Sequence, residues 1–157
     1  MNKVISKKIC FAASSGGHYE QLLMLRPLME KYECFIITEK TNYTNEIEGI
    51  NTYYIKQVNR KEPSVIPKMI INTLYSLKIH FKENPDCVIT TGVLAMIPMC
   101  LIAKLFGKKL IYIESFAKVK SATLSGKFLY KFADQFYVQW EDMLRIFPNA
   151  IFKGGIY

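Results

Sequence analysis

The sequence is poor in the residues that build metal centres and disulfide frameworks. It has two histidines, His18 and His80, and four cysteines that lie far apart, at positions 10, 34, 87 and 100. A zinc site needs a cluster of such ligands at close spacing, so we expect no metal site and assign no cofactor. Because three of the cysteines fall inside apolar segments of strand length, we expect buried free thiols in a reducing compartment.

Long apolar runs are scarce as well. The uncharged stretch 87–103 contains Gly92 and Pro98, whereas a membrane-spanning helix needs about 20 apolar residues. We therefore expect no transmembrane helix, and interpret this stretch as a strand, a turn and a buried helix. The apolar part of the first residues is too short for a signal peptide.

Positive charge is in excess, with a net charge of +8 and an isoelectric point near 9.3. This excess indicates an anionic partner, such as nucleic acid, an acidic membrane surface or a phosphorylated substrate. The lysines are scattered, and no helix-turn-helix, zinc-finger or RNA-binding motif is present, so we expect no nucleic-acid partner. Half of the 157 residues are hydrophobic, which is typical of a folded chain, and the length fits one domain, 1–157.

Apolar segments of strand length alternate with helical patterns along the whole chain. We expect strands at 8–12, 34–38, 52–56, 87–90, 109–114, 135–138 and 150–152, and helices at 18–30, 64–82, 93–106, 125–132 and 141–146. Continuous apolar strands separated by helices predict an α/β fold, with a parallel sheet covered by helices on both faces. In such folds, ligands bind beyond the carboxyl ends of the strands.

The most informative segment is Ser14-Ser15-Gly16-Gly17-His18, which follows the first strand and opens a helical pattern. Glycine lets the backbone come close to a ligand, and N–H groups of a first helical turn point at a bound anion, so the segment predicts a phosphate or diphosphate site. His18 lies at its rim with an imidazole that can take up a proton. Two alternatives stay open: a purely structural turn, and a dinucleotide site with Glu39 as the ribose-binding acid, although the full G-x-G-x-x-G pattern is absent.

Two further segments end strands at the same edge of the expected sheet. Thr90-Thr91-Gly92 is a second glycine turn, and the two turns together could hold both phosphates of one diphosphate. Glu114 ends the strand 109–114, where burial would suit its carboxylate to act as a base. A carboxylate at that position can instead accept hydrogen bonds from the following loop and order it, and the sequence does not distinguish these roles.

Three other features have both a structural and a functional interpretation. The helix 64–82 has apolar residues on more than one face with lysines beside them, which fits packing on the sheet or an amphipathic surface on an anionic bilayer. Trp140 is either a core residue with a satisfied N–H or a partner contact. The apolar segment 152–157 is typical of docking.

Several of these segments together resemble a known family. SSGGHYEQLLML resembles the glycine–histidine loop of membrane-associated glycosyltransferases of the GT-B fold. PDCVITTG, LIYIESFAKVKSATLSGKFLYKFADQFYVQWEDM and FPNAIFKGG resemble the acceptor-side, membrane-recruiting subunit of the split N-acetylglucosaminyltransferase that extends the dolichol-diphosphate sugar. Bacterial relatives of that family serve capsule and exopolysaccharide synthesis. The resemblance covers nearly the whole chain and is most specific over 113–140.

The resemblance implies a Rossmann-like domain equivalent to the N-terminal half of a GT-B enzyme. A partner chain binds the UDP-sugar donor, and the active site forms between the two chains. This subunit then recruits the partner to the membrane and faces a polyprenyl-diphosphate-sugar acceptor. In the related single-chain peptidoglycan transferase, two glycine loops lie near the acceptor diphosphate. By motif they match Ser14–His18 and Thr91–Gly92 here, and Glu114-Ser115 matches the family's "ES" pair.

We therefore expect one half of an inverting, UDP-sugar-dependent glycosyltransferase, inactive alone, at the cytoplasmic face of a membrane. Eukaryotic members carry an N-terminal membrane anchor that we do not find in this sequence, so we expect attachment peripherally or through other proteins. His18 is the first candidate for the base and Glu114 the second. Ser14, Ser15, Gly16, Gly17, Thr91, Gly92, Ser115 and Lys118 are expected to bind the diphosphate, and Gln139, Trp140, Gly154, Gly155 and Tyr157 to contact the partner. A non-catalytic scaffold and a free-standing dinucleotide enzyme are the alternatives.

Overall fold

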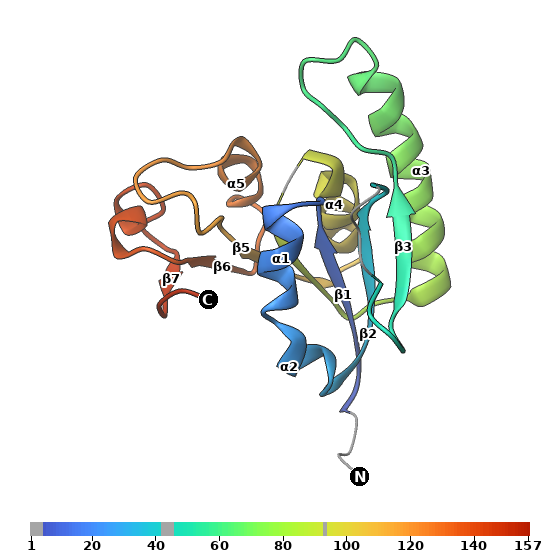
Figure 1. Ribbon diagram of the computed structural model, residues 1–157, viewed down its shortest axis with the longest axis horizontal. Coiled ribbons are helices and arrows are strands. Elements are labelled where there is room, and N and C mark those ends of the chain that lie inside the picture. The colour runs from blue at the N-terminus through green and yellow to red at the C-terminus, as the bar shows by residue number, and fades with distance from the viewer. Residues whose placement is uncertain (1–4, 42–45, 93) are drawn as a thin grey trace.

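A sheet of seven parallel strands forms the centre of the computed structural model, which describes residues 5–41, 46–92 and 94–157 (Figure 1). The strands are β1 (Ile5–Ala13), β2 (Tyr32–Glu39), β3 (Asn51–Ile55), β4 (Cys87–Gly92), β5 (Lys109–Ile113), β6 (Gln135–Val138) and β7 (Ile151–Phe152). They lie in the order β3-β2-β1-β4-β5-β6-β7. The order reverses between the neighbours β1 and β4, which is where folds of this kind bind their ligands.

Helices cover both faces of the sheet. They are α1 (Gly17–Leu23), α2 (Arg26–Met29), α3 (Val65–Glu83), α4 (Ile97–Leu105) and α5 (Leu124–Leu129), with 3-10 turns η1 (Leu94–Met96) and η2 (Glu141–Arg145). In Figure 1, α1 and α2 lie in front of the central strands, while α3 and α4 pack against each other on the opposite face. The expected α/β fold with both faces covered is confirmed.

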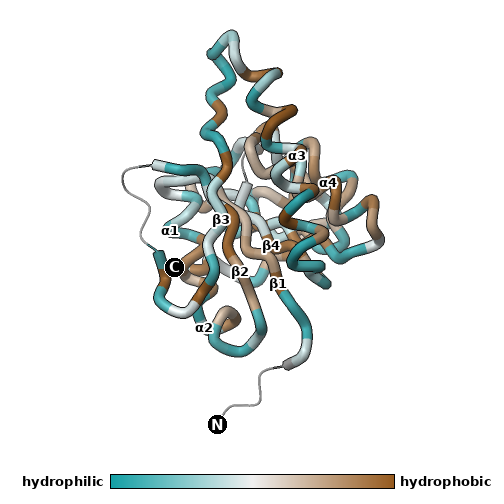
Figure 2. Tube along the Cα trace, turned by 90° about the vertical axis from the view of Figure 1, so that its right-hand side faces the viewer, coloured by the Kyte–Doolittle hydropathy of each residue, from teal (hydrophilic) through white to brown (hydrophobic). Residues whose placement is uncertain are grey.

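The core consists of two layers, one on each side of the sheet. Side chains of a strand alternate between faces, so Cys10 packs in the cluster under α3 and α4, and Phe11 packs in the cluster under α1 and α2. Figure 2 shows hydrophobic colour along the central strands, which are apolar because neither face meets water.

All seven expected strands are present, and β6 has the expected bounds. The helices differ more. The expected helix 18–30 is broken into α1 and α2, with Pro27 in the first turn of α2, where proline's missing N–H is tolerated. The expected helix 93–106 begins with the 3-10 turn η1 before α4, and the expected helix 141–146 is the 3-10 turn η2.

The apolar stretch 87–103 is placed as predicted, whereas the prediction of buried cysteines holds for Cys10 and Cys100 and not for Cys34 and Cys87, which are half-buried. All four cysteines are free thiols, and burial raises the pKa of Cys100 to about 12. The stretch divides into β4, η1 and most of α4. Among the described helices, none is both long and apolar enough to cross a membrane. The described residues contain no group of histidine, cysteine and acidic side chains that could hold a metal ion.

Candidate functional site

The two glycine loops meet at the point where the strand order reverses. The Nδ1 atom of His18 lies 2.7 Å from the carbonyl oxygen of Thr91. The Thr91 hydroxyl in turn donates to the carbonyl oxygen of His18 at 2.8 Å. These two bonds join residues 73 positions apart, so the structure brings together the two loops that the sequence placed on one edge.

The bond to Thr91 determines which nitrogen of His18 is basic. A carbonyl oxygen only accepts, so the Nδ1 of His18 donates its hydrogen to Thr91. In the neutral imidazole, Nε2 then has the free lone pair. A histidine held by its Nδ1–H in this way is oriented to accept a proton at Nε2.

Glycine is required at one turn of each loop. Gly16 has φ 76°, and Gly92 has φ 102°, conformations that side chains rarely adopt. A Cβ atom at Gly92 would also lie 3.0 Å from the Tyr112 hydroxyl and 3.7 Å from Cε1 of His18. The second glycine therefore leaves room for the Tyr112 hydroxyl beside the end of β4, and its backbone conformation disfavours any side chain.

A hollow of about 360 Å³ opens beside His18. Its walls come from the start of α1, the loop after β5 and the segment 153–157. Of the residues expected to be functional, the hollow is lined by Gly17, His18, Ser115 and Tyr157. Sequence reasoning missed Gln21, Phe116 and Ala117, which also line it. One feature of the sequence could have identified Gln21, because it is a polar residue on the side of α1 that faces the core.

Glu114 is buried beneath the loop that forms one wall of the hollow. Its side chain accepts hydrogen bonds from the N–H of Ser115 (2.8 Å), the N–H of Thr123 (3.2 Å) and the hydroxyl of Thr123 (2.9 Å). It is 1% exposed, and a Cβ atom at Gly126 would overlap its carboxylate. Of the two roles left open, this geometry favours the one in which Glu114 orders the loop 115–123.

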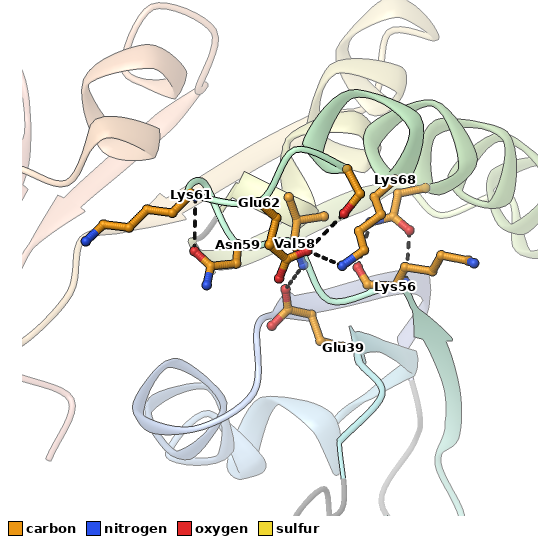
Figure 3. A network of polar contacts seen from close by, with 9 residues as sticks. Glu39, Lys56, Val58, Asn59, Lys61, Glu62 and Lys68 are labelled. Carbon is orange, nitrogen blue, oxygen red and sulfur yellow. Dashed lines mark hydrogen bonds and ion pairs between the residues drawn. The ribbon is translucent and has the colours of Figure 1, made fainter.

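Glu39, the acid of the dinucleotide alternative, is also turned into the protein. Its carboxylate accepts from the N–H of Val58 at 3.1 Å and from the hydroxyl of Ser15 at 3.4 Å, and burial raises its pKa. Figure 3 shows Glu39 pointing at the loop after β3, where Asn59 and Glu62 bond within the same loop and to α3. A carboxylate used in this way is not placed to bind a ribose.

The remaining expected diphosphate-binding residues lie near the hollow without lining it. The hydroxyl of the buried Ser14 donates to the carbonyl of Ser15, and Ser15 itself faces Glu39. Lys118 is half-exposed, directly after the lining residue Ala117, and its amide N–H donates to the carbonyl of Ser115 at 2.9 Å. Among the described residues, no carboxylate forms an ion pair with the Lys118 amine.

The expected partner-contacting residues fall into two groups. Gln139 is 4% exposed, and both ends of its amide are used inside the protein, so its assignment to a partner interface is corrected. The indole N–H of Trp140 donates to the carbonyl of Phe116 at 2.7 Å. This bond agrees with the structural interpretation of Trp140, in which its N–H has a partner inside the protein. Gly154 and Gly155 are exposed, and Tyr157 is 64% exposed.

Comparisons with known proteins agree with this architecture. Residues 29–156 match a family model described as "Oligosaccharide biosynthesis protein Alg14 like". The chain is 43% identical to "UDP-N-acetylglucosamine transferase subunit alg14" of Schizosaccharomyces pombe, over 97% of this chain and 84% of that protein. It is 29% identical to the human protein "UDP-N-acetylglucosamine transferase subunit ALG14", over 96% of this chain and 83% of that one.

Two solved structures show the same fold. MurG of Acinetobacter baumannii superposes with a TM-score of 0.72 at 18% identity, over 87% of this chain. The UDP-N-acetylglucosamine 2-epimerase of Rickettsia bellii superposes with a TM-score of 0.73 at 10% identity, over 97% of this chain. The chain spans 42% of the first structure and 46% of the second, so it corresponds to less than half of either protein.

Proposed function

Since the chain belongs to the Alg14-like family of oligosaccharide biosynthesis proteins, we propose that it is the acceptor-side half of a two-chain glycosyltransferase. The donor is UDP-N-acetylglucosamine, which fits the names of its relatives. The acceptor is a polyprenyl-diphosphate-linked sugar, and a second chain holds the donor. The observation that supports this assignment is the His18 imidazole, tied to Thr91 and lining the hollow where the strand order reverses.

The chemistry assigned to this half is removal of one proton. Nε2 of His18 accepts the proton of the acceptor hydroxyl while that oxygen attacks the anomeric carbon of the donor sugar. The bond from that carbon to UDP breaks, and UDP leaves with the bonding electrons. A base held by its other ring nitrogen is fixed in orientation and in tautomer, which is how histidine bases are commonly placed.

The acceptor diphosphate is assigned to the loops on either side of His18. Gly17 and Ser115 line the hollow and offer donors, and Lys118 carries a positive charge directly after the lining residue Ala117. Bonds from charged or backbone donors to phosphate oxygens are among the stronger ones. Glu114 supports this wall by ordering the loop 115–123 and takes no proton itself.

Reconstitution of the two purified chains tests whether sugar transfer needs both of them. Sugar transfer is measured from UDP-N-acetylglucosamine to a membrane polyprenyl-diphosphate-sugar, with this chain alone, with the donor-binding glycosyltransferase chain encoded beside it, and with both. We expect turnover only with both, because each half lacks one substrate site. Full activity of the partner alone would contradict the proposal and leave this chain as a scaffold.

The outer face of α3 is proposed as the surface that meets the membrane. Its apolar side chains at helical spacing are open to solvent: Ile66 is 72%, Ile70 57%, Leu74 62% and Phe81 66% exposed. In Figure 1, α3 forms the outermost element on its side of the sheet. Lys78 and Lys82 on the same helix add positive charge, while the amine of Lys68 is paired with the carboxylate of Glu62. An apolar face bordered by lysines fits an anionic bilayer surface.

Charging this face should weaken membrane binding. The double substitution Ile70→Glu and Leu74→Glu is expected to lower the affinity for phosphatidylglycerol–phosphatidylcholine vesicles by roughly 10-fold or more, since two apolar side chains no longer enter the bilayer. Vesicle flotation at two salt concentrations measures the effect. The matched control is Val119→Glu with Ile146→Glu, the same charge change at exposed apolar positions elsewhere. Equal loss in both pairs would contradict a specific role for α3.

A further inference from the structure

The aromatic ring of Phe116 forms one wall of the hollow beside His18. Phe116 is half-buried, so part of its side chain is packed in the protein and part is open. The lining residues that come from α1 and from the rest of the loop after β5 are small or polar. Phe116, with the ring of Tyr157 beside it, therefore supplies the aromatic side of the hollow.

Side chains from two distant elements hold the backbone of Phe116 in place. Its N–H donates to the side-chain oxygen of Gln21, on α1, at 3.2 Å, and its carbonyl oxygen accepts from the indole of Trp140 at 2.7 Å. Gln21 also donates to the carbonyl of Glu114 at 3.3 Å. Because Gln21 is 2% exposed, its bonds compete little with water. The position of the Phe116 backbone thus does not depend on the Phe116 side chain.

The ring of Phe116 is packed against three other groups. The Trp140 ring lies 4.9 Å away and the Tyr157 ring 5.0 Å away, measured between centroids. A Cβ atom at Gly155 would lie 3.1 Å from Cε2 of the Phe116 ring, so the backbone passes close to the ring there. A ring held in this way is ordered before a ligand arrives, and binding then spends little free energy on ordering it.

A sugar ring matches the chemistry of this wall. The proposed function places a sugar in the hollow, because the acceptor hydroxyl has to reach Nε2 of His18. The hollow measures about 360 Å³, which lies within the range of small-molecule sites. The faces of a pyranose ring carry C–H groups, and the negative face of an aromatic ring attracts them. A diphosphate needs hydrogen-bond donors and positive charge instead.

We propose that Phe116 is the stacking surface for the first sugar of the acceptor and that Gln21 is its positioning residue. This inference rests on the proposed function and divides the acceptor between two subsites. The sugar lies against the Phe116 ring, next to His18, while the diphosphate meets the donors of the glycine loop and the loop after β5. Phe116 then determines affinity for the sugar and takes no part in proton transfer.

Binding of two related ligands to this chain tests the stacking surface. The probes are a short-chain polyprenyl-diphosphate N-acetylglucosamine and the same polyprenyl diphosphate without the sugar. Phe116→Leu should weaken binding of the first by roughly 5-fold or more and of the second by less than about 2-fold, because only the first has a ring to stack. The control Phe128→Leu, the same change at an exposed position on α5, should alter neither dissociation constant.

Kinetics of the assembled enzyme provide a second readout. Phe116→Leu should raise KM for the acceptor by roughly 5-fold or more and change kcat less than about 2-fold, since it removes a binding contact and no proton acceptor. Phe116→Tyr keeps an aromatic ring and should restore KM. Folding is retained in both variants, because the bonds to Gln21 and Trp140 use the backbone of residue 116. A loss confined to kcat would contradict the proposal.

Gln21→Leu tests the positioning residue. It removes the bond to the N–H of Phe116, so we expect weaker binding of the sugar-bearing probe and a shifted emission of Trp140, the single tryptophan. Gln135→Leu, the same change at an exposed position on β6, should leave both unaltered. Unaltered binding of both probes in a folded Gln21→Leu chain would overturn its positioning role. The Phe116 variants test the stacking surface even where Gln21→Leu does not fold.

The outcomes separate this inference from the proposed function. If the unaltered chain binds both probes and Phe116→Leu weakens neither, or weakens both equally, the stacking surface is wrong and the split transferase stands. If the unaltered chain binds neither probe, the acceptor assignment and the stacking surface are overturned together. Selective loss of the sugar-bearing probe in Phe116→Leu, with recovery in Phe116→Tyr, is the supporting result.

Discussion

Replacing His18 with alanine is expected to reduce sugar transfer by the assembled enzyme by about 10²-fold or more, with folding retained. The imidazole is tied through Nδ1 to the carbonyl of Thr91 and lines the hollow where the acceptor is placed. Alanine removes the proton acceptor. Folding should survive because the hydrogen bond from the Thr91 side-chain hydroxyl to the His18 backbone carbonyl does not need the ring. Steady-state transfer and a thermal melt of the same preparation measure the two effects.

His18→Asn is the matched control that distinguishes a role of His18 in joining the two loops from a role as proton acceptor. Its side-chain amide can still donate to Thr91, but it has no basic nitrogen. We expect His18→Asn to lose as much activity as His18→Ala. If His18→Asn retained most of the activity, the role of His18 would be to join the two loops. Near-normal turnover in both variants would remove His18 from the mechanism.

Replacing Glu114 with alanine is expected to destabilise the chain by roughly 3–5 kcal/mol, because it leaves several buried donors without an acceptor. Those donors are the N–H groups of Ser115 and Thr123 and the hydroxyl of Thr123. For a chain of 157 residues, such a loss lowers the unfolding midpoint by about 10 °C. Calorimetry or circular dichroism at neutral pH measures it. Glu141→Ala, which removes an exposed carboxylate, should leave the midpoint unchanged.

Glu114→Gln separates the two roles that the sequence left open. Glutamine keeps the shape and one acceptor oxygen, so we expect a smaller stability loss, about 1–2 kcal/mol, and activity that falls in proportion to the folded fraction. A loss of transfer of about 10²-fold at an unchanged midpoint would instead identify Glu114 as the base. That result would contradict the assignment of the base to His18.

The strands and the glycine turns could be predicted because their signals are local. β6 was predicted at its observed bounds, and the loops after β1 and β4 were predicted to lie on one edge. A strand buried on both faces must be apolar throughout, and a turn with positive φ strongly favours glycine. Both constraints appear in the sequence itself. The break between α1 and α2 was missed because apolar spacing continues across it while Pro27 starts a new helix.

The partners of buried polar side chains were less predictable. Gln139 was expected at a partner interface, yet it bonds to the backbone of residues 25 and 17 positions away. Gln21 was not singled out, although it bonds to residues 93 and 95 positions away. A polar residue next to apolar ones has the same local appearance whether it faces solvent or a buried carbonyl.

Local pattern was therefore sufficient for the α/β fold, for the strands of its sheet and for the neighbourhood of His18. Burial and backbone conformation restrict residue type position by position, which makes such features readable along the chain. The place of Tyr157 in the wall of the hollow, the loop-ordering bonds of Glu114 and the buried hydrogen bonds of Gln21 and Gln139 emerged only once distant segments were packed together. Hydrogen bonds of this kind depend on which backbone groups lie opposite each other in space, and that is decided by the packing of the whole sheet.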